Sequence, residues 1–158
     1  MSMQEEAAMK AARIAENTAE AEISDLIHQW RQAILDHDHD RIATFYAPDV
    51  LAFDAVEALQ LKGRDGYRDA WKKGFEHLKG GRIVFDLAEV AVAAGADVAF
   101  STAMVHCGGI GTDGKEQTGW MRYTGCWRRQ GGRWQVAHEH FSVPFDMASG
   151  KALLGLEP

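Results

Sequence analysis

Residues 116–146 contain two strand-like runs on either side of Gly131-Gly132, and this stretch constrains the fold more than any other. A Gly-Gly pair permits the positive φ angles of a tight hairpin turn, so the two runs are expected to pair as antiparallel strands. A strand with one face in water would alternate cleanly between apolar and polar residues. Here both faces carry large aromatic and ionisable side chains. The stretch therefore predicts a strand pair at the wall of a partly polar cavity.

The two-residue period of a β-strand divides the side chains of each run between two faces. In the second run, the period places on one face Trp134, Val136, His138, His140 and Ser142. It places on the other face Gln135, Ala137, Glu139 and Phe141. In the first run, Arg122 shares a face with Thr124 and Cys126. The period leaves open which face lines the cavity.

Three helices are predicted in the first half of the chain. Residues 1–18 are rich in Ala, Glu and Met, and we expect a loosely ordered helical extension that either touches a partner subunit or frays. The first firm helix begins after Asn17-Thr18, either of which can cap it, and its apolar residues recur at helical spacing as far as His37. Two further helices are predicted at 40–46 and 64–78.

The segment 37–40 alternates two His with two Asp. A metal site is one interpretation of this pattern, but adjacent residues on a turn rarely converge on one ion. We prefer the interpretation that Asp38 caps the second helix, since short polar side chains at this position bind backbone N–H groups. The sequence predicts no metal and no cofactor.

Strands are predicted at 50–54, 58–62, 82–94 and 98–107, before the pair in 116–146. Helices grouped early and strands grouped late are typical of the α+β class. Strands joined by hairpins form an antiparallel sheet, and the helices must cover one of its faces. A strongly curved, mostly antiparallel sheet over three N-terminal helices makes a cone with an internal pocket.

Composition narrows the function classes. The 158 residues suffice for one domain with a sizeable core. The net charge of −6 and the pI of about 5.6 argue against nucleic acid and membrane surfaces as partners. We find no apolar run of about 18 residues that would span a membrane, and the charged N-terminus does not match a secretory signal. Cys107 and Cys126 are too few for a disulfide framework, which favours a cytoplasmic location.

Three segments carry a family resemblance: FYAPDVLAFDA (45–55), KGRDGYRDAW (62–71) and WRRQGGRWQVAHEHFSVPFD (127–146). The chain resembles the nuclear transport factor 2-like superfamily, particularly its SnoaL-like and ketosteroid-isomerase-like branch. It is also similar to the association domain of calcium/calmodulin-dependent kinase II. The most specific feature is a Trp, Gly-Gly and Trp followed by His-x-His-x-Ser before a Pro.

The resemblance implies a cone fold, a pocket between sheet and helices, and dimerisation through the outer face of the sheet. It divides the chain into a helical extension (1–18), a cone domain (19–146) and a C-terminal tail (147–158). It leaves the function open, because this fold hosts isomerases, cyclases and dehydratases as well as non-enzymatic assembly domains.

Asp54 is the first candidate catalytic residue, because it follows the apolar run Leu51-Ala52-Phe53. If Asp54 points into the cone, an apolar wall would raise its pKa and make it a usable proton acceptor. The alternative is an Asp exposed at the end of a strand.

His138 and His140 are the next candidates, as two ligands of a metal that would need a third, as an acid and base pair, or as hydrogen-bonded core histidines. Arg122 needs a partner, which would be Asp54, Glu139 or an anionic ligand. Glu139 itself is expected in a subunit contact or a surface ion pair. The predicted ligand-binding residues are Trp30, Tyr46, Trp71, Phe75 and Thr124.

The sequence thus predicts a domain that binds an anionic or carbonyl-bearing small molecule. In its enzymatic form, Asp54 transfers a proton on a carbonyl compound, and Arg122 with His138 or His140 stabilises the oxyanion. The alternative is a non-enzymatic association module. In both cases we expect a homodimer.

Overall fold

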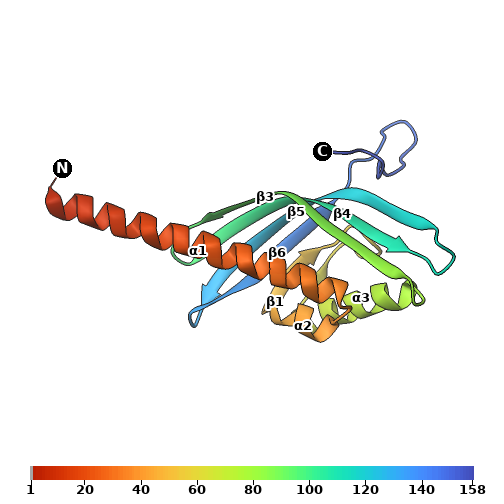
Figure 1. The fold of residues 1–158 in the computed structure, drawn as a ribbon, viewed down its shortest axis with the longest axis horizontal. Coiled ribbons are helices and arrows are strands. Elements are labelled where there is room, and N and C mark those ends of the chain that lie inside the picture. Colours follow the sequence, from red (N-terminus) through yellow and green to blue (C-terminus); the bar gives the residue numbers. More distant parts are fainter. Residues whose placement is uncertain (1) are drawn as a thin grey trace.

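Six strands form one curved sheet in the order β2-β1-β6-β5-β4-β3 (Figure 1). The structure is a computed structural model and describes residues 2–158. The strands are β1 (Tyr46–Phe53), β2 (Leu61–Lys62), β3 (Arg82–Ala94), β4 (Val98–Ile110), β5 (Glu116–Gln130) and β6 (Arg133–Ser142). Neighbouring strands are antiparallel except β1 and β6, which are parallel. The predicted α+β class and the hairpin from β5 to β6 are confirmed.

The three helices are α1 (Met3–Leu35), α2 (His39–Thr44) and α3 (Arg64–His77). The core lies between these helices and one face of the sheet, and no helix of the described residues covers the other face (Figure 1). The C-terminal half of α1 packs along β3, and α3 packs on β1. Within residues 2–158, no helix has the length and hydropathy needed to cross a membrane.

Helix α1 is one continuous helix, so the predicted start after Asn17-Thr18 is wrong. Ser2 caps it through a capping box, in which its Oγ accepts from the backbone N–H of Glu5 at 3.2 Å. Thr18 cannot act as a cap, because its hydroxyl donates to the carbonyl of Ile14 within the helix, at 2.9 Å. Residues 3–18 are all exposed, and this half of the helix extends away from the sheet (Figure 1).

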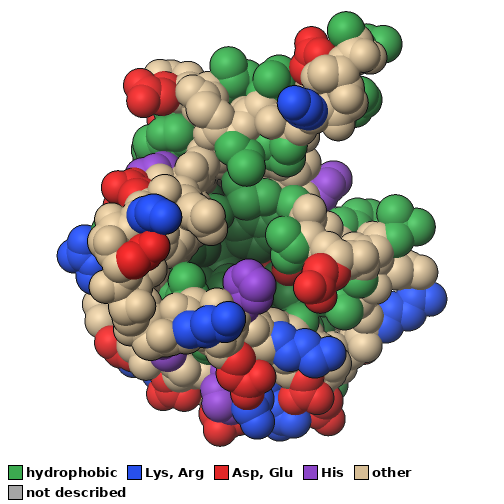
Figure 2. All heavy atoms as spheres, turned by 90° about the vertical axis from the view of Figure 1, so that its right-hand side faces the viewer, with side chains coloured by type: hydrophobic (Ala, Val, Ile, Leu, Met, Phe, Trp, Pro, Cys, Tyr) green, Lys and Arg blue, Asp and Glu red, His purple; other side chains and the backbone are tan. Residues whose placement is uncertain are grey.

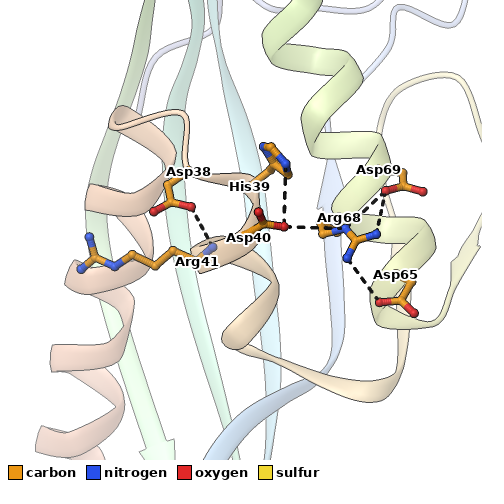
Figure 3. A network of polar contacts seen from close by, with 7 residues as sticks. All are labelled: Asp38, His39, Asp40, Arg41, Asp65, Arg68 and Asp69. Carbon is orange, nitrogen blue, oxygen red and sulfur yellow. Dashed lines mark hydrogen bonds and ion pairs between the residues drawn. The ribbon is translucent and has the colours of Figure 1, made fainter.

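Helix α2 is shorter than predicted, and the chain enters β1 already at Tyr46. The predicted cap is confirmed: the Asp38 side chain accepts from the backbone N–H of Arg41 at 2.9 Å. Asp40 lies 4.0 Å from Arg68, which also pairs with two acids of α3 (Figure 3). The alternating His and Asp residues therefore serve a helix cap and surface ion pairs between α2 and α3.

Strand β6 contains a bulge that reverses the predicted faces of its second half. Cys126 pairs with His138 and Trp127 pairs with Val136, so Ala137 has no partner of its own on β5. As a result, Val136 and Glu139 both point to the core side of the sheet, whereas His138 points to the outer side. The prediction that Val136 shares a face with His138 is wrong, because it assumed an uninterrupted two-residue period.

Candidate functional site

A cavity of about 670 Å³ opens at one end of the cone, between α3, the ends of β3 and β4, and the inner face of the sheet. Figure 2 looks into this end and shows a hollow with hydrophobic walls and charged side chains around its rim. Its apolar lining includes Trp71, Phe75, Ile83, Phe85, Met121 and Phe141. The size and the mostly apolar lining are those of a small-molecule site.

Asp54 lies at the wall of this cavity, one residue past the end of β1. Burial raises the pKa of its carboxyl group, and hydrogen bonds from the backbone N–H groups of Ala55 and Val56 oppose part of that rise. The Ala55 N–H donates to Asp54 Oδ1 at 2.7 Å. The lining also contains Asp113 and Lys115, which lie in the turn before β5, and His77 at the end of α3.

Glu139 is completely buried behind the cavity, and three tyrosines from three different elements donate to it. Tyr46 and Tyr67 both donate to Oε1, the first at 3.0 Å, and Tyr123 donates to Oε2 at 3.3 Å. Trp30 Nε1 in turn donates to the Tyr46 hydroxyl at 3.0 Å. We call Glu139 with Tyr46, Tyr67 and Tyr123 the tyrosine–carboxyl cluster.

Within residues 2–158, no cation forms an ion pair with Glu139. Burial raises its pKa to about 7, and the charge of Asp54 adds to this rise, while the hydrogen bonds from the phenols lower it. The pKa values of the three tyrosines are raised well above 10, first by burial and next by the charge of Glu139. The tyrosines therefore remain donors over the whole physiological range.

Little in the sequence indicates this cluster. Glu139 was expected at a subunit contact or in a surface ion pair, because the regular period put it opposite Trp134. The one signal was that Glu139 shares a face with Phe141, an aromatic side chain that favours burial.

Arg122, His138, His140 and Thr124 lie on the outer face of the sheet, so the structure does not bring them together with Asp54. Arg122 Nε donates to Ser142 Oγ at 3.1 Å, which is a partner the sequence did not suggest. His138 Nδ1 lies 2.6 Å from the carbonyl oxygen of Leu51. The bulge in β6 and the inward position of Tyr123 on β5 account for this placement.

The four predicted aromatic residues divide into two groups. Trp71 and Phe75 line the cavity. Trp30 and Tyr46 are buried in the core, and Trp30 supports the wall because its ring packs edge-on against Phe85, with centroids 5.3 Å apart. The indole N–H of Trp71 is buried and has no hydrogen-bond partner within residues 2–158.

Comparison with known proteins identifies the family. The family model of the SnoaL-like domain matches residues 23–146, whereas no curated protein matches the chain. An NTF2-like protein of unknown function from Pseudomonas putida KT2440 is 45% identical, with a TM-score of 0.82 over 90% of this chain and 98% of that chain.

Two more distant structures share the fold. One is a protein with a cystatin-like fold from Caulobacter vibrioides, 19% identical, with a TM-score of 0.65 over 80% of this chain and 90% of that chain. The other, from Xanthomonas campestris, is described provisionally as a calcium/calmodulin-dependent protein kinase II association domain. It is 21% identical, with a TM-score of 0.64 over 77% of this chain and 84% of that chain. The chain belongs to the SnoaL-like domain family of the NTF2-like superfamily.

Proposed function

We propose that the protein binds a neutral, carbonyl-bearing small molecule in the cavity and that Asp54 accepts a proton from it. The observation that carries this proposal is a half-buried carboxyl group at the wall of a mostly apolar cavity of about 670 Å³. A carboxyl group whose pKa is raised by burial is a stronger base than an exposed one and works closer to neutral pH.

The charges in the lining favour a neutral ligand over an anionic one. Arg122, on which the prediction of an anionic ligand depended, lies on the outer face of the sheet. Of the groups that line the cavity, only Lys115 carries a permanent positive charge, and it lies 3.7 Å from Asp113. An acid that entered the cavity would meet the charge of Asp54 without a cation to offset it.

The Trp71 indole supports the carbonyl group as the recognised feature. A buried N–H group without a partner costs free energy, and a shift of the Trp71 ring on binding would let it donate to a carbonyl oxygen in the cavity. In the reaction that we propose, Asp54 takes a proton from the carbon next to the carbonyl, which leaves an enolate, and the same carboxyl group returns the proton.

Matched ketone and acid probes test this function. We expect 2-acetylnaphthalene to raise the melting temperature more than 2-naphthoate does. We also expect the protein to accelerate deuterium exchange of the methyl protons of the ketone in D₂O, as followed by NMR. Asp54→Asn should abolish the acceleration and retain binding, whereas Asp97→Asn, in the exposed turn between β3 and β4, should change neither. Stronger binding of the acid, or unchanged exchange in Asp54→Asn, would refute the proposal.

The outer face of the sheet supports a second proposal, a homodimer. This face carries Val98, which is 66% exposed, and Phe100, which is 54% exposed. It also carries Phe53, whose ring packs edge-on against His138, with centroids 4.7 Å apart. A stable interface buries on the order of 1,500 Å² in total, and an exposed sheet face of this width supplies such an area. Sedimentation at micromolar concentration tests this proposal, which also applies to an association module.

A further inference from the structure

Helix α3 carries a glycine in its interior, Gly74, on the side that lines the cavity. Residues one helical turn apart form two lines along this side, which are Trp71, Phe75 and Leu78, and Ala70, Gly74 and His77. A Cβ atom at Gly74 would meet no atom of residues 2–158 within 4 Å, and the backbone there is helical. Neither packing nor backbone conformation therefore requires glycine, although glycine in a helix interior costs about 0.5–1 kcal/mol relative to alanine.

The free space at Gly74 lies at the opening of the cavity. Gly74 both lines the cavity and is exposed to solvent, whereas Trp71, three residues earlier, is half-buried. One turn after Gly74, the side chain of Leu78 lies against Gly109 of β4, since a Cβ atom at Gly109 would collide with it. Helix α3 thus touches the sheet at Leu78, and the missing side chain at Gly74 leaves a passage between the cavity and solvent. Figure 2 shows the hollow open at this end of the molecule.

The turn before β5 places polar groups near the same end of α3. A Cβ atom at Gly81, just after α3, would lie 3.3 Å from the Cα atom of Gly111, so the turn lies beside the end of the helix. The Gly111 N–H donates to the carbonyl of Lys115 at 2.9 Å, which closes the turn. Asp113, Lys115 and Gln117 all line the cavity. Together they offer hydrogen-bond donors and acceptors without a net charge.

We propose that Gly74 is a specificity-determining residue and that the ligand has two parts. A carbonyl-bearing apolar part lies next to Asp54, and an uncharged polar extension passes Gly74 toward the turn at 111–115. The volume of about 670 Å³ supports this, because cavities of roughly 300–1,000 Å³ bury drug-sized ligands, which are larger than a two-ring ketone. The inference rests on the proposed function, which supplies the carbonyl-bearing part.

Alkylation of Cys107 tests the passage without any ligand. Cys107 lines the cavity, and Cys126→Ser removes the other cysteine, which is on the outer face of the sheet. The two reagents are iodoacetamide and the much larger 5-iodoacetamidofluorescein, which share one chemistry. Burial raises the pKa of the Cys107 thiol to about 11, so both reagents are compared at the same alkaline pH.

Gly74→Leu should narrow the passage in a folded protein, because leucine is a good helix former. We expect this substitution to slow the larger reagent by about tenfold relative to the smaller one, since the leucine side chain would have to move aside. Gly66→Leu is the matched control on the same helix: Gly66 is exposed and does not line the cavity, so the ratio of the two rates should not change. An unchanged ratio in Gly74→Leu would overturn the role of Gly74.

Two ketones test the two-part ligand. 2-Acetylnaphthalene represents the apolar part, and 2-acetyl-6-(2-hydroxyethoxy)naphthalene adds an uncharged polar extension. By isothermal titration calorimetry, we expect Gly74→Leu to weaken binding of the extended ketone by about tenfold and to leave 2-acetylnaphthalene nearly unchanged. Equal weakening of both ketones would overturn the two-part ligand. A wild type that binds neither ketone would refute the proposed function and the two-part ligand with it, whereas the ratio of alkylation rates would still decide the role of Gly74.

Discussion

Glu139 should make the stability of the protein depend on pH in an unusual direction. Burial raises its pKa from 4.5 to about 7, so the folded protein binds more protons than the unfolded chain between these values. The stability that it contributes is fully present below pH 4.5 and is lost as the pH rises through 7.

We therefore expect the free energy of unfolding of the wild type to fall, relative to Glu139→Gln, by on the order of a few kcal/mol between about pH 5 and about pH 8. Urea unfolding of both proteins at the two pH values measures the difference. Because only the change with pH is compared, a constant cost of the substitution does not affect the result. Parallel pH dependences in the two proteins would contradict the raised pKa.

Because Gly125 has no side chain, the Tyr123 hydroxyl can occupy the space next to its Cα atom. A Cβ atom at this position would lie 2.5 Å from Tyr123 Oη and 3.0 Å from Ser101 Oγ. Gly125→Ala should push Tyr123 away from Glu139 and cost about 1–3 kcal/mol of stability.

The matched control for this substitution is Gly66→Ala on the exposed side of α3, where a Cβ atom meets nothing within 4 Å. There we expect a gain of about 0.4–1 kcal/mol, because Ala fits a helical backbone and loses less conformational entropy than Gly on folding. Urea unfolding at pH 7 compares both variants with the wild type. Equal changes in the free energy of unfolding for the two substitutions would show that Tyr123 moves aside without a loss of stability.

At the scale of the elements, the two halves of α1 should contribute unequally to stability. Ile23 is completely buried against the sheet, and Ile14, two and a half turns earlier, is 58% exposed. Ile23→Ala should cost about 2–5 kcal/mol, because it leaves a cavity in the core. Ile14→Ala should stay within about 0.5 kcal/mol. Urea unfolding measures both, and a large cost at Ile14 would indicate that residues 3–18 are covered in solution by another subunit.

The elements also show what the sequence could predict. Strong signals located α3, the strand pair around Gly131-Gly132 and the buried stripe of α1, because helical spacing and turn residues are local properties. The faces of β6 could not be predicted beyond Val136, since a bulge depends on how β5 pairs with β6 and leaves no local mark. Asp54 could be placed at the cavity because the apolar run before it is a local signal. Glu139 and His138 lie beyond the bulge, so the regular period predicts the wrong face for both.

At the scale of the whole molecule, the outer face of the sheet should control assembly. Phe100 is exposed on this face and lies opposite Cys126 on β5. Phe100→Asp places a charge in the proposed interface and should shift the protein from dimer to monomer, because an unpaired charge buried between subunits is costly.

Sedimentation velocity measures this shift, and circular dichroism checks that the variant remains folded. Lys72→Asp, a substitution on the exposed side of α3, is the control and should not change the oligomeric state. A wild-type protein that is monomeric at micromolar concentration would end the proposal.

The bulge at Ala137 has a consequence for how this site is compared between related chains. Deletion of Ala137 would keep Val136 inside and His138 outside, so every later side chain would stay on its present face. Retention of the residue with regular pairing would instead turn His138 inward and Glu139 outward. Relatives of equal length can thus carry an imidazole where this chain carries a carboxyl group, and relatives one residue shorter can share its chemistry. Alignments of the family at this strand should therefore follow strand pairing rather than residue count.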